Sequence, residues 1–199
     1  KIMNRRNLDT AHKDKKDEFY TQYEDVEREM NAYFDFDQNV FEGKVVLCPC
    51  DDPEWSNFTR YFAQNFEKLK LKKLITTSFA NDSKFDDIKV PPTDYEKNSP
   101  QYDETKTFSH GKIFSLERKN NEEKVDISKL EWKYLEGDGD FRSAEVTKLR
   151  DEADIIVTNP PFSLFREFVP WIMDGNKKFI ILGNQNAITY KEIFPLIMS

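Results

Sequence analysis

The sequence has few side chains that bind metal ions. Its 199 residues contain two cysteines, Cys48 and Cys50, and two histidines, His12 and His110. The cysteines lack Cys-x-x-Cys spacing and the histidines lie far from them, so we expect no metal site. Two cysteines separated by one residue are typical of small packing residues at a strand end. They also favour reduced thiols and a cytoplasmic protein.

The sequence also lacks long apolar runs and an excess of basic residues. No run approaches the roughly 20 apolar residues of a membrane span, and no signal peptide opens the chain, so we expect no membrane contact. Lys and Arg number 30 against 37 Asp and Glu, a formal net charge of −7. Because phosphate contacts need Lys and Arg, the bulk of the chain is not expected to cradle nucleic acid. A DNA enzyme whose basic surface lies on another segment is still allowed.

Strand and helix patterns alternate along the chain, which predicts an α/β domain with a mostly parallel, doubly wound sheet. A probable hairpin turn at 119–122 predicts an inserted hairpin, and the polar stretch 81–107 predicts an insertion. The predicted strands are 43–48, 71–79, 111–116, 124–127, 132–136, 153–158 and 178–183, and the predicted helices are 23–34, 56–70, 143–150 and 164–173.

The chain is organised around a buried strand, 153–158, that ends abruptly at Asn159-Pro160-Pro161-Phe162. Ligands of open α/β sheets bind at the carboxyl ends of the strands. The side-chain oxygen of Asn159 and the carbonyl of Pro160 could accept hydrogen bonds from a planar exocyclic amine, such as that of adenine. Phe162 offers a face for base stacking. The alternative is an ordinary Asn-Pro turn.

Acidic loops follow two other predicted strands. Asp51 and Asp52 stand where a dinucleotide-binding loop would carry glycines. They would repel a pyrophosphate but suit a cationic ligand, such as S-adenosylmethionine. Gly-Asp-Gly-Asp at 137–140 could aim a carboxylate of Asp138 or Asp140 at an adenine amino group, with Phe141 packed on the purine. Turn and helix-start chemistry is the alternative in both places.

Taken together, these loops resemble the amino-DNA methyltransferases, and most closely the EcoRI-type adenine-specific DNA methyltransferase family. The Asn-Pro-Pro-Phe box is shared with RNA and protein methyltransferases, whereas Cys-Asp-Asp-Pro in place of a glycine loop is more specific. The resemblance covers most of 17–199 and rests on 17–22 (Asp-Glu-Phe-Tyr-Thr-Gln), 50–53 (Cys-Asp-Asp-Pro), 56–58 (Ser-Asn-Phe) and 71–76 (Leu-Lys-Lys-Leu-Ile-Thr).

The resemblance implies a Rossmann-like class I methyltransferase fold that uses S-adenosylmethionine to methylate the N6 amine of a flipped adenine in DNA. Asn159 and Pro160 would accept from the amine, next to Pro161, and Phe162 would stack on the base. Phe19, Tyr20 and Thr21 would cover the methionine part of the cofactor, although Phe19 and Tyr20 also suit a hydrophobic staple before the first helix. The remaining residues that the resemblance assigns to the cofactor site are Cys48, Cys50, Asp51, Asp52, Ser56, Phe58, Asp138 and Asp140.

The resemblance also predicts the domain organisation and the partners. Residues 1–16 would be a flexible lead-in and 17–199 the catalytic domain, with a region that recognises double-stranded DNA after residue 199. A cognate restriction endonuclease acting on the same site is a further expected partner. The alternatives are an RNA or protein-amide methyltransferase that uses the same box, and a non-catalytic specificity module on the same fold.

Overall fold

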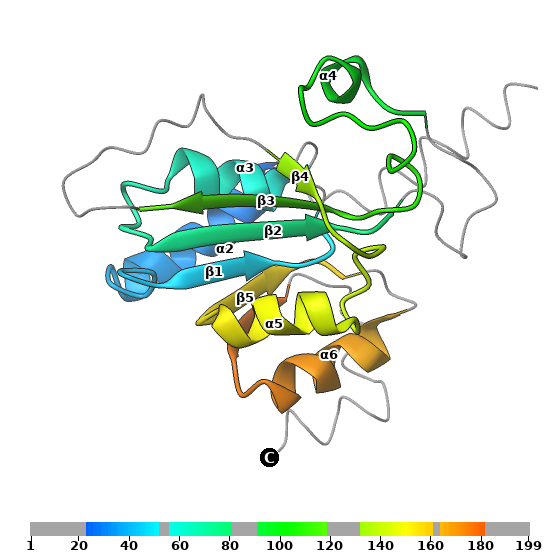
Figure 1. The fold of residues 1–199 in the computed structure, drawn as a ribbon. Helices are drawn as coiled ribbons and strands as arrows, with labels where there is room; N and C mark the ends of the chain where they lie inside the picture. Colours follow the sequence, from blue (N-terminus) through cyan, green and yellow to red (C-terminus); the bar gives the residue numbers. More distant parts are fainter. Residues whose placement is uncertain (1–22, 52–55, 81–90, 119–131, 161–163, 182–199) are drawn as a thin grey trace, which may run out of the picture.

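The computed structural model describes residues 23–51, 56–80, 91–118, 132–160 and 164–181. They form one six-stranded sheet with helices on both faces (Figure 1). The strands are β1 (Val45–Cys48), β2 (Lys73–Ser78), β3 (Lys112–Glu117), β4 (Trp132–Tyr134), β5 (Ile155–Thr158) and β6 (Lys178–Ile181). The helices are α2 (Tyr23–Phe36), α3 (Asn57–Gln64), α4 (Asp94–Lys97), α5 (Ala144–Glu152) and α6 (Phe165–Asp174).

The sheet has the order β4-β3-β2-β1-β5-β6. β1 pairs in parallel with β2 and β5, and β5 pairs in parallel with β6. β3 is antiparallel to both β2 and β4, so β4 runs in the same direction as the other strands. The predicted α/β class and the mostly parallel sheet are therefore confirmed, and β3 is an antiparallel strand inserted between two strands of common direction.

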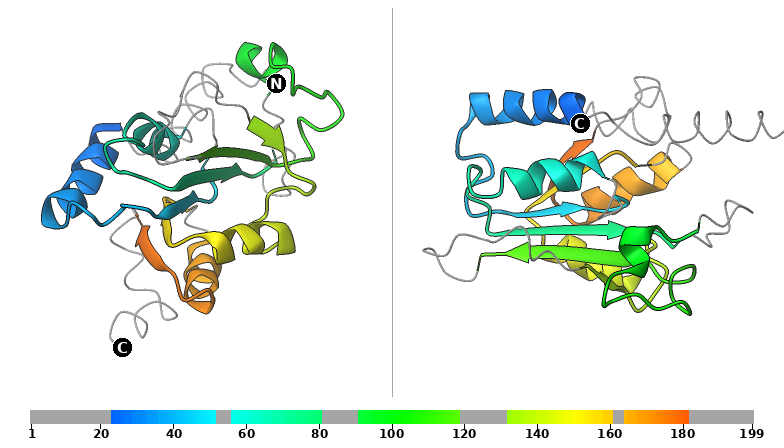
Figure 2. Two further views of the ribbon diagram at one scale, coloured as in Figure 1. Left: turned by 60° about the vertical axis from the view of Figure 1, so that its left-hand side comes forward. Right: turned by 90° about the horizontal axis from the view of Figure 1, so that it is seen from above.

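Alternating side chains of each central strand enter two separate cores. On β1, Val46 and Cys48 face α2 and α3, whereas Val45 and Leu47 face α5 and α6. All four side chains are buried, which explains why this strand is a continuous apolar run. Figure 2 shows the two helix pairs on opposite sides of the sheet, the arrangement expected of a doubly wound domain.

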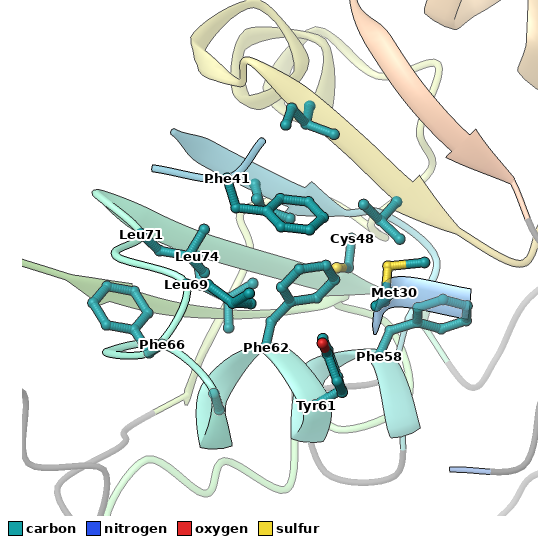
Figure 3. Packing of buried hydrophobic residues seen from close by; sticks show 14 of the residues in the cluster. Met30, Phe41, Cys48, Phe58, Tyr61, Phe62, Phe66, Leu69, Leu71 and Leu74 are labelled. Atoms are coloured by element: carbon teal, nitrogen blue, oxygen red, sulfur yellow. The ribbon is translucent and has the colours of Figure 1, made fainter. Parts of the chain in front are cut away.

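The first core is rich in aromatic rings. Phe41 and Phe62 meet edge to face at 5.4 Å, and Phe62 also contacts Tyr61 at 5.3 Å. Figure 3 shows the Phe62 ring pointing from α3 towards the sheet, with Phe41, Met30 of α2 and Cys48 of β1 near it. Burial of each such large apolar side chain stabilises the fold by about 1.5–3 kcal/mol. The strand ends are thus held in fixed positions by packing on both faces of the sheet.

The predicted helix over 56–70 is too long, because α3 ends at Gln64. The side-chain amide of Asn65 donates to the Tyr61 carbonyl at 2.9 Å, and turns continue to Lys70, which has a φ of 52°. Phe66 and Leu69 are still buried. The helical spacing of the apolar residues therefore indicated burial correctly, but not the backbone conformation beyond residue 64.

The inserted strand lies where the hairpin was predicted. Its described antiparallel partners are β2 and β4, and the predicted second strand of the hairpin, 124–127, lies outside the described residues. The segment before β3 is anchored by a buried ion pair between Lys112 and Glu96 at 2.8 Å. Thr107 also donates to the Glu96 carboxylate at 2.6 Å. In Figure 1, α4, which carries Glu96, lies apart from both helix pairs.

No helix among the described residues is long and apolar enough to cross a membrane.

Candidate functional site

The candidate site lies at the carboxyl edge of the sheet. Since β1, β2, β4, β5 and β6 share one direction, their carboxyl ends lie along the same edge. Three loops that carry predicted site residues begin there: 49–51 after β1, 135–142 after β4 and 159–160 after β5. This is the place where open α/β sheets bind ligands.

The loops after β1 and β5 are joined by a hydrogen bond. The Thr158 hydroxyl, on the last residue of β5, is fully buried and donates to the Pro49 carbonyl at 2.7 Å. Asn159 follows directly and is half-buried, and Pro160 is buried. The candidate amine-binding residues therefore begin beside the acidic loop of β1, as strand order alone would require.

The Asp51 carboxylate is held at the start of α3. Asp51 is 7% exposed, and its backbone N–H donates to the Thr77 carbonyl of β2 at 2.8 Å. The Ser56 hydroxyl donates to Oδ1 of Asp51 at 3.0 Å and accepts from the N–H groups of Phe58 and Thr59. Ser56 is the N-cap of α3, so the same hydroxyl both starts the helix and orients the carboxylate.

The chain reaches Asp51 through a residue in the left-handed region, because Cys50 has a φ of 65°. Non-glycine residues rarely adopt this conformation outside tight turns. Burial, and then the charges of Asp51 and Asp140, raise the pKa of the Cys50 thiol. Burial and Asp51 likewise raise the pKa of Cys48. Both thiols therefore stay protonated. Cys50 also packs against the core cluster that contains Phe141, so the loops after β1 and β4 lie near one another.

The Gly-Asp-Gly-Asp loop is fixed against the end of β2. The Ala80 N–H donates to the Asp138 carbonyl at 2.7 Å, and the Gly111 N–H donates to the Gly137 carbonyl at 2.9 Å. Gly139 has a φ of +81°, and a Cβ there would overlap the Ser78 carbonyl oxygen. A glycine is required at this position because the two backbones approach so closely.

The two acids of this loop differ in their surroundings. Asp138 is exposed, and its Oδ1 accepts from the Asp140 N–H at 3.0 Å. Asp140 is half-buried and forms a two-pronged ion pair with Arg142, with Nε to Oδ1 at 2.9 Å and Nη2 to Oδ2 at 2.6 Å. Hydrogen bonds from Arg142 lower the pKa of Asp140. The inner acid is thus a fixed carboxylate, whereas the outer acid faces solvent.

Two predicted aromatic contacts lie in the core. Phe141 is 2% exposed and packs edge-on against Phe168 and Trp171 of α6, so its ring is buried in the protein rather than open to a purine. Phe58 is also 2% exposed and belongs to the core under α3. The predicted site residues that lie outside the described residues are Phe19, Tyr20, Thr21, Asp52, Pro161 and Phe162.

The residues at this edge suit a cationic ligand better than a phosphate. Asp51 and Asp140 supply carboxylates, and the guanidinium of Arg142 is already bound by Asp140 and by Glu167 of α6. Carboxylates favour an ammonium or a sulfonium by direct charge attraction. No group of three or more His, Cys, Asp or Glu side chains within the described part of the chain could hold a metal ion.

Sequence reasoning missed two contributors to this geometry. Thr158 was assigned only to the buried strand, and nothing in its surroundings in the sequence predicts that its hydroxyl reaches Pro49. Arg142 lies two residues from Asp140, which is a usable signal for an ion pair, but its second partner, Glu167, lies 25 residues away.

Comparison with known proteins gives the family. A family model described as "Adenine-specific methyltransferase EcoRI" matches residues 7–199. The chain belongs to this family. The family was therefore identified correctly from the stretches 17–22, 50–53, 56–58 and 71–76.

Curated relatives of the family are similar along almost the whole chain. The chain is 43% identical over 192 residues to the type II methyltransferase M.EcoRI of Escherichia coli, which covers 96% of this chain and 52% of that protein. It is 37% identical over 186 residues to M.MpnI of Mycoplasma pneumoniae, covering 94% and 46% respectively. The chain thus spans about half the length of these relatives. No solved structure matches it.

Proposed function

We propose that the protein carrying this chain methylates the N6 amine of adenine in DNA, with S-adenosylmethionine as the methyl donor, as part of a restriction-modification system. The observation that carries the proposal is the position of Asn159 and Pro160. They follow a buried strand at the carboxyl edge, and Thr158 ties that strand end to the loop before Asp51. Membership of the adenine-specific family supports the same activity.

The chemistry at Asn159 depends on hydrogen-bond acceptors. The lone pair of an exocyclic amine is delocalised into the ring, so the amine is a weak nucleophile. The Asn159 amide oxygen and the Pro160 carbonyl would accept its two N–H groups and return electron density to nitrogen. We propose that Phe162, next to Pro161, stacks on the base. No strong base is needed in this scheme.

The cofactor supplies an electrophilic methyl group. We propose that the Asp51 carboxylate, which Ser56 orients, attracts its ammonium group, and that Asp140 accepts from its adenine amino group, with Asp138 outside it. The residues proposed to surround the cofactor further are Phe19, Tyr20, Thr21, Cys50 and Asp52, whereas Cys48 and Phe58 lie in the core beneath this edge. Aromatic faces near a sulfonium are favourable for the same reason as cation–π contacts.

Double-stranded DNA is the proposed substrate, gripped mainly by the part of the protein that corresponds to the unmatched half of the relatives. Flipping the base out of the duplex costs a few kcal/mol, which this second region would supply. A cognate endonuclease would act on the same site. A cytoplasmic location suits the two free thiols, Cys48 and Cys50.

The test is transfer of a tritiated methyl group to duplex DNA by the intact protein that carries this chain. We expect Asn159→Ala to lower kcat by about a hundredfold or more, by analogy with the loss of a transition-state hydrogen bond. Binding of S-adenosylmethionine, measured by calorimetry, should remain in the micromolar range. Asn39→Ala is the matched control, since Asn39 is exposed and precedes the opposite end of β1.

The outcomes separate the candidate functions. Transfer by the Asn159→Ala variant at the normal rate would refute the amine-binding role. Label in RNA or in a protein amide, but not in DNA, would replace the proposed substrate while keeping the site. A folded protein that gives no heat with S-adenosylmethionine would refute the cofactor assignment altogether.

A further inference from the structure

One arginine joins a loop and a helix of the proposed site. Arg142 forms its two-pronged ion pair with Asp140, and its Nη1 donates to Glu167 at 2.6 Å. Asp140 belongs to the loop after β4, whereas Glu167 lies in the first turn of α6. α6 is the helix that the chain enters after Asn159 and the two prolines.

Arg142 contacts both oxygens of the Asp140 carboxylate. Oδ1 accepts from the Arg142 N–H at 2.8 Å and from its Nε at 2.9 Å. Oδ2 accepts from Nη2 at 2.6 Å and from the same Nε at 3.2 Å. Arg142 therefore fixes the plane and the orientation of this carboxylate at the edge of the sheet.

The same two elements are also packed together beneath the bridge. The Phe141 ring lies 5.0 Å from the Phe168 ring and 5.5 Å from the Trp171 ring, both on α6. The Arg142 guanidinium lies 5.4 Å from the centre of the Phe141 ring. The ion pairs thus extend an aromatic contact to the surface, and they fix the first turn of α6 against the acidic loop.

We propose that Arg142 is a positioning residue of this site, which orients the Asp140 carboxylate and holds the first turn of α6 in register with it. The inference rests on the proposed function. In that function a methyl donor bound at the acidic loop must meet an amine bound at Asn159, and small displacements between reacting groups are costly in rate. Arg142 contacts both the loop that would bind the methyl donor and the first turn of α6, which follows the amine-binding residues.

Because the ion pairs of Arg142 are exposed, their role in activity can be distinguished from a role in stability. The side chain of Arg142 is 44% exposed and that of Glu167 is 53% exposed. Exposed ion pairs add little to the free energy of unfolding. Loss of the bridge should therefore change kinetics more than it changes Tm.

The experiment compares four variants of the intact protein: Arg142→Ala, Arg142→Lys, Glu167→Gln and the control Arg28→Ala. Arg28 also forms an ion pair, with Asp25 at 2.6 Å, on the exposed side of α2. Each variant is assayed for methyl transfer (kcat and the KM of S-adenosylmethionine), for cofactor Kd by calorimetry and for Tm.

Loss of the contact with Asp140 and loss of the contact with Glu167 should change different kinetic constants. We expect Arg142→Ala to raise the KM and Kd of the cofactor by roughly tenfold or more and to lower kcat as well. Arg142→Lys should recover only part of the lost cofactor affinity and kcat, because an ammonium group cannot form the two-pronged ion pair with Asp140. Glu167→Gln should lower kcat with the cofactor Kd unchanged, and Arg28→Ala should resemble wild type.

The inference is overturned if Arg142→Ala, while folded, has wild-type kcat and KM, or if its losses follow Tm alone. Should Arg142→Ala not fold, Glu167→Gln decides, since a wild-type kcat for that variant contradicts the coupling. An inactive wild-type protein would instead refute the proposed function, so the two failures can be told apart.

Discussion

At the scale of residues, the positions of the acids in the candidate site were easier to predict than the groups that hold them. Asp51, Asp140 and Asn159 each follow a strand in the sequence, and strand direction alone places them at one edge. The bond from Thr158 to Pro49 and the contact of Arg142 with Glu167 join segments distant in the chain. No local pattern encodes such contacts, because they depend on how neighbouring elements pack.

Two glycines with positive φ provide a matched test of the acidic loop. At Gly43 a Cβ would meet nothing within 4 Å, whereas at Gly139 it would overlap the Ser78 carbonyl oxygen. Gly43→Ala should cost about 1–2 kcal/mol, from backbone strain alone. Gly139→Ala should cost roughly 2–5 kcal/mol, from strain and overlap together. Urea unfolding measures both, and equal losses would show that the loop yields to the added methyl group.

At the scale of elements, periodicity located most of the helices and strands. The helix after β1 was predicted to begin at Ser56, whose hydroxyl accepts from two N–H groups of α3. The end of that helix was misplaced, because buried Phe66 and Leu69 continue the apolar spacing through turns. The pairing of β3 between β2 and β4 could not be predicted either, since register between distant strands leaves no local signal.

The cap of α3 allows stability and binding to be separated. Ser56→Ala and Ser143→Ala each remove an N-cap, of α3 and α5, and should each cost about 1 kcal/mol in unfolding free energy. Ser56→Ala also removes a donor from Asp51, so it alone should weaken S-adenosylmethionine binding in calorimetry. Equal cofactor affinity in the two variants would contradict the assignment of Asp51 to the cofactor.

At the scale of the whole molecule, charge and length bear on where the cofactor and the DNA would bind. The chain carries a net charge of −7 and covers about half of its relatives. An acidic domain gains little from phosphate contacts, because its 37 Asp and Glu side chains outnumber its 30 Lys and Arg side chains and repel DNA phosphates. These quantities support the proposal of a cofactor site on this chain and a duplex-binding surface elsewhere in the intact protein.

The 199-residue chain alone should therefore bind duplex DNA poorly. We expect a Kd weaker than about 10⁻⁴ M at physiological salt. The intact protein should bind the same duplex more tightly than the 199-residue chain does. Fluorescence anisotropy with a labelled oligonucleotide, in a series of salt concentrations, measures both. Tight, salt-sensitive binding by the 199-residue chain would place the recognition surface within it.

Because β3 runs in the reverse direction, the connections before and after it lie at opposite edges of the sheet. The chain enters β3 at Lys112, which pairs with Ser78 at the edge that carries Asn159 and the acids, and leaves it at Glu117, which pairs with Lys73 at the opposite edge. Changes in length before Lys112 alter the surroundings of the candidate site, whereas the connection after Glu117 starts at the far edge of the sheet. An epitope tag or fluorescent label for following turnover is therefore better inserted after Glu117 than before Lys112.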